Sequence, residues 1–329
     1  MTIIKNFLEI SILSYNRTNE LERIFRSLDS IDRDDVKVCV YEDCSPNQAL
    51  IREICKKYSD ELIIDIEFKP SVINLGYDKN LLRAFSSESE YILLLSDDDF
   101  IEASFLDHFI DTLRSKSPDI LISPYTTPDI SRIGAHFNEA YSIDVLYDSI
   151  LFSGLTFKVK SVSITKDEED FLSQSIYVQV FLLCKYWNTS CGYFDKPLVI
   201  AGSDGENYFG KSDVSSQMKT LSDRSALMSN IHYQVYFQRV AFKSLNLYYP
   251  DLVKQFMINY SKRLVSHFIR VRLKSSLAQY IKSILEFRKI NVAYNSSYMF
   301  FILIIIFLPK FLLRPLYNIL INKFRISGG

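Results

Sequence analysis

A chain of 329 residues with 48% hydrophobic residues can bury a sizeable core, which excludes an intrinsically disordered protein. The net charge of −1 is unevenly divided, because residues 251–329 carry 13 Lys and Arg against Asp251 and Glu286. This basic C-terminal region is expected to meet an anionic surface. The five cysteines form no CxxC pair, and the N-terminus is too short and too charged for a signal peptide. A reducing cytosol fits this composition.

In chain order, apolar runs of the buried-strand type alternate with amphipathic helices over roughly the first 125 residues. The predicted strands are 9–14, 36–41, 62–68, 91–96 and 119–123. The sequence Ser45-Pro46-Asn47-Gln48 predicts a capped start for the second helix. The alternation predicts an α/β fold with a mostly parallel sheet flanked by helices.

The second half of the chain has a different pattern. From about 125 to 215 it is mixed, with an acidic stretch, Asp167–Asp170, ahead of a predicted helix at 171–187, and with a glycine-rich loop at Gly202–Gly210. Amphipathic helices rich in Tyr, Phe, Lys and Arg follow from about 220 to 289. We expect an α/β domain over 1–215 and a helical basic tail over 216–329.

The sharpest polar signal is the stretch Tyr91–Phe100, which reads YILLLSDDDF. Ligands of open α/β sheets gather just beyond the carboxyl ends of such strands, and hard divalent cations take oxygen ligands. If the segment stays extended, Asp97 and Asp99 point the same way and could share one metal ion, while Asp98 faces elsewhere. The alternative is an acidic turn that merely closes a strand.

Other chemistries lack their signatures in this sequence. It contains no GxGxxG, GxxxxGK[ST], HExxH or GxSxG, and its four histidines are scattered. Carboxylates at strand ends remain, without a phosphate-binding glycine loop. A metal ion that bridges protein carboxylates to a diphosphate would account for that combination.

Four stretches in order carry a family resemblance: SILSYNR (11–17), VYEDCS (40–45), NLGYDKN (74–80) and LSDDD (95–99). The sequence resembles glycosyltransferase family 2, whose members have the nucleotide-diphospho-sugar transferase (GT-A) fold. Its length, its SDDD form and its basic tail look most like O-antigen or capsule sugar transferases of the abequosyltransferase-like subgroup. Four ordered motifs are far more specific than any single one.

The resemblance also implies roles for individual residues. Residues 1–125 would bind the nucleotide and 126–215 the acceptor. Asp97 would lie near the ribose, and with Asp99 it would bind the Mg²⁺ or Mn²⁺ that bridges the diphosphate. The nucleotide-sugar contacts implied are Tyr15, Arg17, Asp43 (to the nucleobase), Asn74 and Asp97. Family members often have aspartate where this chain has Glu42 and Ser96, and neither change removes the metal-binding carboxylate.

The general base is open among several acids. Asp170 or Glu169, ahead of the predicted helix, fits the family's downstream acidic residue, although acids in a first helical turn also follow from the helix dipole. Asp204 in the glycine-rich loop is the competitor. The family's acidic position can also align with Gln179, which would leave the base unplaced.

The C-terminal region has two interpretations. Residues 298–309 form an uncharged apolar run that is short for a membrane span and suits an interfacial segment, and basic residues flank it. A membrane-associating segment over 298–321 is therefore expected. The alternative is a core helix with a solvated basic face.

Together these features predict an inverting, metal-dependent hexosyl- or deoxyhexosyltransferase at the cytosolic face of a bacterial inner membrane. Its partners would be a nucleotide-sugar donor, a lipid-linked glycan acceptor and the anionic membrane surface, with no nucleic acid. One alternative is a non-catalytic sugar-nucleotide-binding or membrane-scaffold protein of the same fold. Another is a nucleotidyltransferase, which usually has a glycine- and basic-rich loop where this chain has Tyr15-Asn16-Arg17-Thr18.

Overall fold

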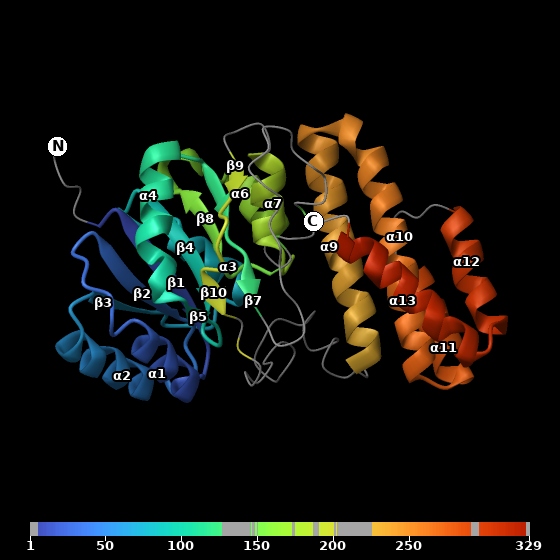
Figure 1. Ribbon diagram of the computed structural model, residues 1–329, viewed down its shortest axis with the longest axis horizontal. Coiled ribbons are helices and arrows are strands. Elements are labelled where there is room, and N and C mark those ends of the chain that lie inside the picture. Colours follow the sequence, from blue (N-terminus) through green and yellow to red (C-terminus); the bar gives the residue numbers. More distant parts are fainter. Residues whose placement is uncertain are drawn as a thin grey trace. The chain divides into compact units, whose positions relative to one another are not determined.

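The structure is a computed structural model that describes residues 6–126, 146, 149, 151–172, 175–186, 191–200, 202, 226–290 and 296–326. The chain divides into two compact units, residues 1–208 and 209–329 (Figure 1). Strands and helices alternate through the first unit, and the described part of the second unit is helical. The predicted α/β fold with a helical C-terminal region is confirmed.

The described strands of the first unit form a seven-stranded sheet that is mostly parallel around its centre. In spatial order the strands are β3 (Asp65–Pro70), β2 (Val36–Glu42), β1 (Leu8–Ser14), β4 (Tyr91–Ser96), β8 (Leu155–Lys158), β6 (Ile120–Ile122) and β9 (Cys191–Tyr193). Strand β1 pairs in parallel with β2 and β4, and β2 pairs in parallel with β3. All five strands predicted from the sequence are present.

Two strands of this sheet, β8 and β9, were not predicted. Strand β8 lies between β4 and β6 and runs antiparallel to both. It comes from the mixed region, where Gly154 donates its backbone N–H to Leu94 and so starts the pairing. The apolar pattern of β8 is only four residues long, too short to separate from a helical turn by periodicity.

The helices cover both faces of the central strands. The helices α1 (Thr18–Ser27), α2 (Gln48–Glu61) and α4 (Leu106–Lys116) share a hydrophobic core with one face of the sheet. Helix α3 (Tyr77–Ala84) packs against β1 and β2. Because side chains alternate along a strand, Leu8, Ile10 and Ile12 enter that core, whereas the buried Glu9 faces the other way and accepts from Ser87 and Tyr41.

Smaller elements complete the first unit. A three-stranded sheet joins β5 (Phe100–Ile101), β10 (Val199–Ile200) and β7 (Tyr125–Thr126). Short 3₁₀ turns lie at Ala103–Phe105 and Val159–Ser161. The single helix predicted at 171–187 is wrong: the structure has α6 (Lys166–Leu172) and α7 (Val178–Lys185). Ile176 has a φ of +55°, a left-handed conformation that a continuous helix cannot contain.

The second unit consists, in its described part, of helices packed around aromatic side chains. They are α9 (Ala226–Tyr248), α10 (Pro250–Lys274), α11 (Leu277–Ile290), α12 (Ser296–Phe307) and α13 (Lys310–Ile326). Proline separates two pairs of them, at Pro250 and Pro309, where the missing N–H and fixed φ favour a new start. Phe256 packs between Phe237 and Tyr260, and Phe268 packs edge-on against Tyr280.

Candidate functional site at the carboxyl edge of the sheet

Three neighbouring strands end at the same edge of the sheet. In the parallel register Ser14 lies beside Glu42, and Leu13 lies beside Ser96. The residues that follow these strands are therefore neighbours in space, although they are far apart in sequence. The structure in this way brings together the predicted positions Tyr15, Arg17, Asp43 and Asp97. Ligands of open α/β sheets bind at this edge.

Asp97 is buried at this edge and is held by the exit of β1. Its carboxylate accepts a hydrogen bond from the backbone N–H of Tyr15 at 2.9 Å and from the Arg17 guanidinium at 2.9 Å. Arg17 also lies 2.7 Å from Asp98. Burial raises the pKa of Asp97 to about 7, and the charge of Arg17 opposes that rise.

The SDDD segment is not extended, contrary to the alternation expected from the sequence. The N–H of Asp99 donates to the carbonyl of Ser96 at 3.2 Å, which closes a turn over residues 96–99. In this turn Asp97 and Asp98 both face Arg17, and Asp99 has other partners. The physical reason is local, because aspartate favours turns where a strand loses its pairing.

Asp99 meets two segments that come from beyond residue 150. The N–H of Gly202 donates to its carboxylate at 3.0 Å, and the Ser153 hydroxyl both hydrogen-bonds Asp99 and accepts from the N–H of Ser96. A Cβ on Gly202 would lie 1.8 Å from the Asp98 carbonyl oxygen, so only glycine fits there. Burial raises the pKa of Asp99 to about 6.

Asp43 organises the loop that precedes α3. Its carboxylate accepts from the N–H groups of Leu75 at 2.7 Å and Gly76 at 2.9 Å, and the side-chain oxygen of Asn74 also accepts from Gly76. Burial raises the pKa of Asp43 to about 6, against these two donors. The predicted positions Asp43 and Asn74 therefore belong to one hydrogen-bonded loop beside the edge.

Glu42 has a structural role that the sequence did not reveal. It is fully buried, and its carboxylate accepts from the N–H groups of Cys44 and Ser45 and from the amide of Gln48. The expected capping box at Ser45–Gln48 is therefore wrong: α2 starts at Gln48 without a side-chain cap, because the Gln48 amide turns to Glu42 instead. Glu42 fixes the turn that carries Asp43.

Of the candidate bases, Glu169 and Asp170 lie exposed within α6 rather than ahead of a long helix. The capping box of α6 is made by their neighbour, because Glu168 accepts from the N–H of Thr165 and its own N–H donates to the Thr165 hydroxyl. Asp204 lies outside the described residues. Gln179 is buried in the first turn of α7 and accepts from the hydroxyl of Tyr77 at 3.3 Å.

Asp78 is an acidic residue that sequence reasoning missed. It sits in the first turn of α3, and its carboxylate accepts from the N–H of Ile176 at 3.0 Å and from the Ser175 hydroxyl at 3.4 Å. Burial raises its pKa to about 7. Asp78 thus ties α3 to the turn that precedes α7. In the sequence Asp78 is marked only by its place inside NLGYDKN, one of the four stretches that carry the family resemblance.

The carboxylates at the edge fit a metal ion whose other ligands come from a substrate. Among the residues that the structure describes, no three His, Cys, Asp or Glu side chains converge as a metal cage. Mg²⁺, however, is commonly held by one or two carboxylates together with substrate phosphates and water. Asp99 is buried beside the charge of Asp98, and both effects raise its pKa, so a cation would stabilise its ionised form.

Comparisons with known proteins identify the fold of the first unit as that of the nucleotide-diphospho-sugar transferases (GT-A). Residues 9–164 match the model of the family described as "Glycosyl transferase family 2". The mannosyltransferase PcManGT from Pyrobaculum calidifontis, solved in complex with GDP-Man and Mn²⁺, is similar in structure, with a TM-score of 0.50 at 9% identity over 73% of this chain and 65% of that chain.

A second solved structure, residues 1–349 of S. aureus TarS in complex with UDP-GlcNAc, gives a TM-score of 0.49 at 14% identity over 80% of this chain and 82% of that chain. At 9% identity the likeness to PcManGT shows the fold alone. No curated protein matches the sequence.

Proposed function

We propose that the protein is an inverting, metal-dependent glycosyltransferase that moves a hexosyl or deoxyhexosyl group from a nucleotide-sugar to a lipid-linked glycan. The glycan would belong to a surface polysaccharide such as O-antigen or capsule. The observation that carries the proposal is the shared edge at which Arg17, Asp43 and Asp97 follow three adjacent strands. The family match over residues 9–164 supports it.

In this proposal each element has a distinct task. Residues 1–125 bind the nucleotide, with Asp43 and the Asn74 loop at the nucleobase and with Tyr15 and Arg17 lining the pocket. Residues 126–215 receive the acceptor, and the helical region 216–329 holds the protein at the cytosolic face of a bacterial inner membrane.

Asp99 would hold the Mg²⁺ or Mn²⁺, whose charge offsets that of the departing diphosphate. Asp97, the second predicted ligand, faces Arg17 in the turn at 96–99 and would reach the ion only after that pair opens. Binding requires the ionised carboxylates, so it competes with protons because burial raises both pKa values. Asp170, Glu169 or Asp204 would take the proton from the acceptor hydroxyl as its oxygen attacks the anomeric carbon opposite the leaving group.

A thermal-shift panel tests the donor class. UDP, GDP, dTDP and CDP are each added with and without Mn²⁺, and a ligand that binds only the folded state raises the melting temperature. The proposal predicts stabilisation by one nucleotide that depends on the metal. Asp99→Ala should remove that dependence, whereas Asp111→Ala, at an exposed acid of α4, should keep it. Equal shifts with and without metal would contradict the proposal.

The second candidate is a non-catalytic sugar-nucleotide-binding or scaffold protein. It is favoured by one observation, that Gln179 rather than an acid occupies the buried first turn of α7. An assay for transfer or hydrolysis of a nucleotide-sugar distinguishes the glycosyltransferase from the non-catalytic binding protein. If Asp99→Ala abolishes turnover, the enzyme is supported. If the wild type binds nucleotide and never turns it over with any lipid-linked acceptor, the binding protein is supported.

A further inference from the structure

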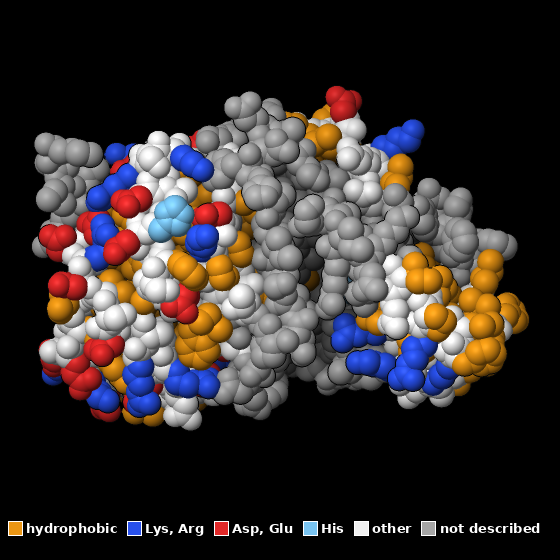
Figure 2. Space-filling view, in the orientation of Figure 1, with side chains coloured by type: hydrophobic (Ala, Val, Ile, Leu, Met, Phe, Trp, Pro, Cys, Tyr) orange, Lys and Arg blue, Asp and Glu red, His pale blue; other side chains and the backbone are white. Residues whose placement is uncertain are grey.

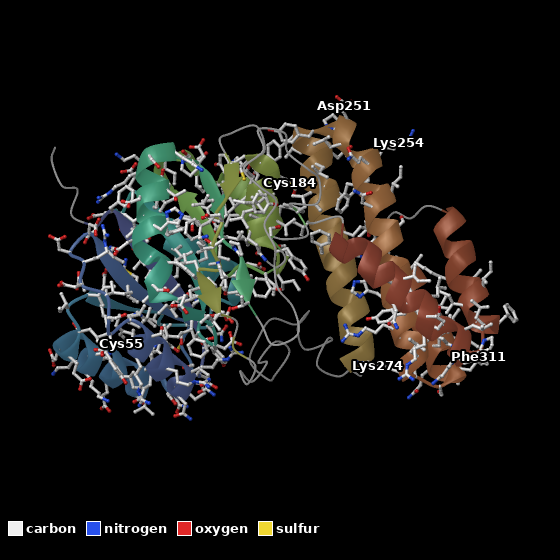
Figure 3. The ribbon with its side chains drawn as sticks, in the orientation of Figure 1. Cys55, Cys184, Asp251, Lys254, Lys274 and Phe311 are labelled. Atoms are coloured by element: carbon white, nitrogen blue, oxygen red, sulfur yellow. The ribbon has the colours of Figure 1, made fainter. Side chains whose placement is uncertain are left out.

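Helices α12 and α13, which follow each other across the turn at Pro309, expose a group of apolar side chains, here called the apolar edge. Its members are Leu303, Phe307, Phe311, Leu312, Leu316 and Ile319, of which Phe307 is 84% and Phe311 74% exposed. Single exposed apolar residues are ordinary on a protein surface, but a contiguous group marks an interaction surface. Phe311, which Figure 3 labels, and Phe307 are separated in the sequence by the turn at Pro309, and the N–H of Leu312 donates to the Pro309 carbonyl.

The apolar edge is the outer side of two helices whose inner side is packed. Ile302, Ile305 and Leu313 are buried, and the Tyr280 hydroxyl of α11 donates to the Ile302 carbonyl at 3.0 Å. Both α12 and α13 pack against α10. The exposed side chains are therefore presented by an anchored scaffold.

Basic residues accompany the apolar edge along α13. Leu312, Leu316 and Ile319 recur at i, i+4 and i+7 spacing on one side of the helix, and the exposed Lys310 and Arg314 lie on another at i, i+4. Lys310 also donates to the Leu273 carbonyl at 3.1 Å, next to the exposed Lys274. Figure 2 shows Lys and Arg side chains beside hydrophobic ones on the described part of this unit. Residues 251–329 carry a net charge of +11.

Helix α12 is too short to cross a bilayer. Helix α12 has 12 residues, which at about 1.5 Å per residue covers little more than half of a hydrocarbon core of about 30 Å. Within the described ranges, no helix combines the length and the apolar character of a membrane span. A helix with an apolar side and a cationic side instead lies in the plane of the lipid headgroups.

We propose that the apolar edge inserts into the headgroup layer of an anionic bilayer, with Phe307 and Phe311 entering deepest and with Lys310 and Arg314 contacting the lipid phosphates. The positive net charge of residues 251–329 favours an anionic bilayer over a protein partner, because lysine is depleted at protein interfaces whereas basic residues attract anionic lipid. The inference rests on the proposed function in one respect, because a lipid-linked acceptor would lie in the membrane that the apolar edge contacts. The lipid contact itself is measured without a donor or an acceptor.

Vesicle flotation of the full chain tests the proposal. The protein should float with vesicles of phosphatidylcholine and phosphatidylglycerol, less with phosphatidylcholine alone, and less again as salt rises. Changing Phe307→Ser and Phe311→Ser together should lower the partition coefficient about tenfold or more. Lys310→Gln with Arg314→Gln should weaken only the binding to anionic vesicles. The matched control is Val72→Ser, a change at an apolar residue that is 93% exposed in the other unit and should have no effect.

Three outcomes would overturn the proposal. The first is that the wild type does not float, and the second is that the double serine variant floats as well as the wild type. The third is that this variant loses a dimer while its vesicle binding persists, a result that would assign the apolar edge to a second copy of the chain. A depth measurement in a Trp187→Phe background, where the introduced tryptophan is the single one in the sequence, adds an independent check: the emission of Phe311→Trp should shift to the blue with anionic vesicles, and that of Val72→Trp should not. Metal-dependent nucleotide binding, measured on the same variants, reports separately on the proposed function and should be unchanged.

Discussion

Arg17 lies 2.9 Å from Asp97 and 2.7 Å from Asp98, so one guanidinium from the exit of β1 is shared by two carboxylates that follow β4. The side chains of Arg17 and Asp97 are only 11% and 7% exposed. The pair therefore lies in a region of weak solvent screening, where removal of one partner leaves a buried charge uncompensated.

The first prediction follows from this pair. At a pH well above 7, where Asp97 is ionised, Arg17→Ala should lower the free energy of unfolding of the first unit by about 3–5 kcal/mol, because Asp97 loses its cation. Arg17→Lys should lose less, since it keeps the charge but not the forked geometry that reaches both aspartates. Chemical denaturation monitored by fluorescence measures both. Equal stability of the alanine variant and the wild type would mean that Asp97 is already protonated in the wild type and does not need the cation.

The second prediction concerns Gly202. Gly202→Ala should prevent the approach to Asp98 and Asp99, because its Cβ would fall 1.8 Å from the Asp98 carbonyl oxygen. We expect the hydrogen bond from Gly202 to Asp99 to be lost, and with it most of the metal-dependent thermal shift given by the nucleotide. Ile200→Ala removes a side chain on the same segment without this clash and is the control. Equal shifts in the two variants would mean that this contact plays no part in binding.

The carboxyl edge could be predicted from the sequence because each central strand is a mostly apolar run that ends at a polar residue. The period of the apolar residues gives the strand, and the βαβ rule gives the parallel direction. The turn at 96–99 could not be predicted, because spacing alone does not separate extended backbone from a turn. Nor could the insertion of β8 between β4 and β6, since its four residues carry no period of their own.

The same limit applies to single residues. Asp78 and Ile176 are 98 positions apart, and only the folded chain brings the carboxylate to that N–H group. Glu42 stood out in the sequence only as a departure from the family's aspartate, whereas in the structure it accepts from three donors that lie within six residues of it in the chain. Local side-chain-to-backbone bonds of this kind compete with the capping pattern that the sequence displayed at Ser45–Gln48.

The third prediction separates this structural carboxylate from the proposed donor site. Glu42→Gln keeps the shape of the side chain but turns an amide N–H₂ toward the N–H groups of Cys44 and Ser45, which are themselves donors. It should therefore destabilise the first unit by about 1–3 kcal/mol. The metal dependence of nucleotide binding should remain, because Asp43, Asp97 and Asp99 are intact. Urea denaturation and the nucleotide thermal-shift panel give the two readouts, with the exposed Glu61→Gln as the control. Loss of metal dependence at full stability would instead place Glu42 in the binding site.

The last prediction is a pH dependence carried by Asp78. Burial raises the pKa of this carboxyl from 3.8 to about 7, so between these values the folded state keeps a proton that the unfolded state has released. The stability that Asp78 contributes is therefore fully present below its unfolded pKa and is lost as the pH rises through the folded one, by at most about 1.4 kcal/mol per pH unit.

Asp78→Asn removes this titration while its side-chain oxygen can still accept from the N–H of Ile176. We expect the free energy of unfolding of the variant to fall less than that of the wild type between about pH 5 and about pH 8, by a few kcal/mol at most. Urea denaturation across this range measures the difference, and Asp60→Asn, at an exposed acid of α2, should follow the wild type. Parallel curves for Asp78→Asn and the wild type would mean that Asp78 is ionised in the fold, with the donors from Ser175 and Ile176 outweighing its burial.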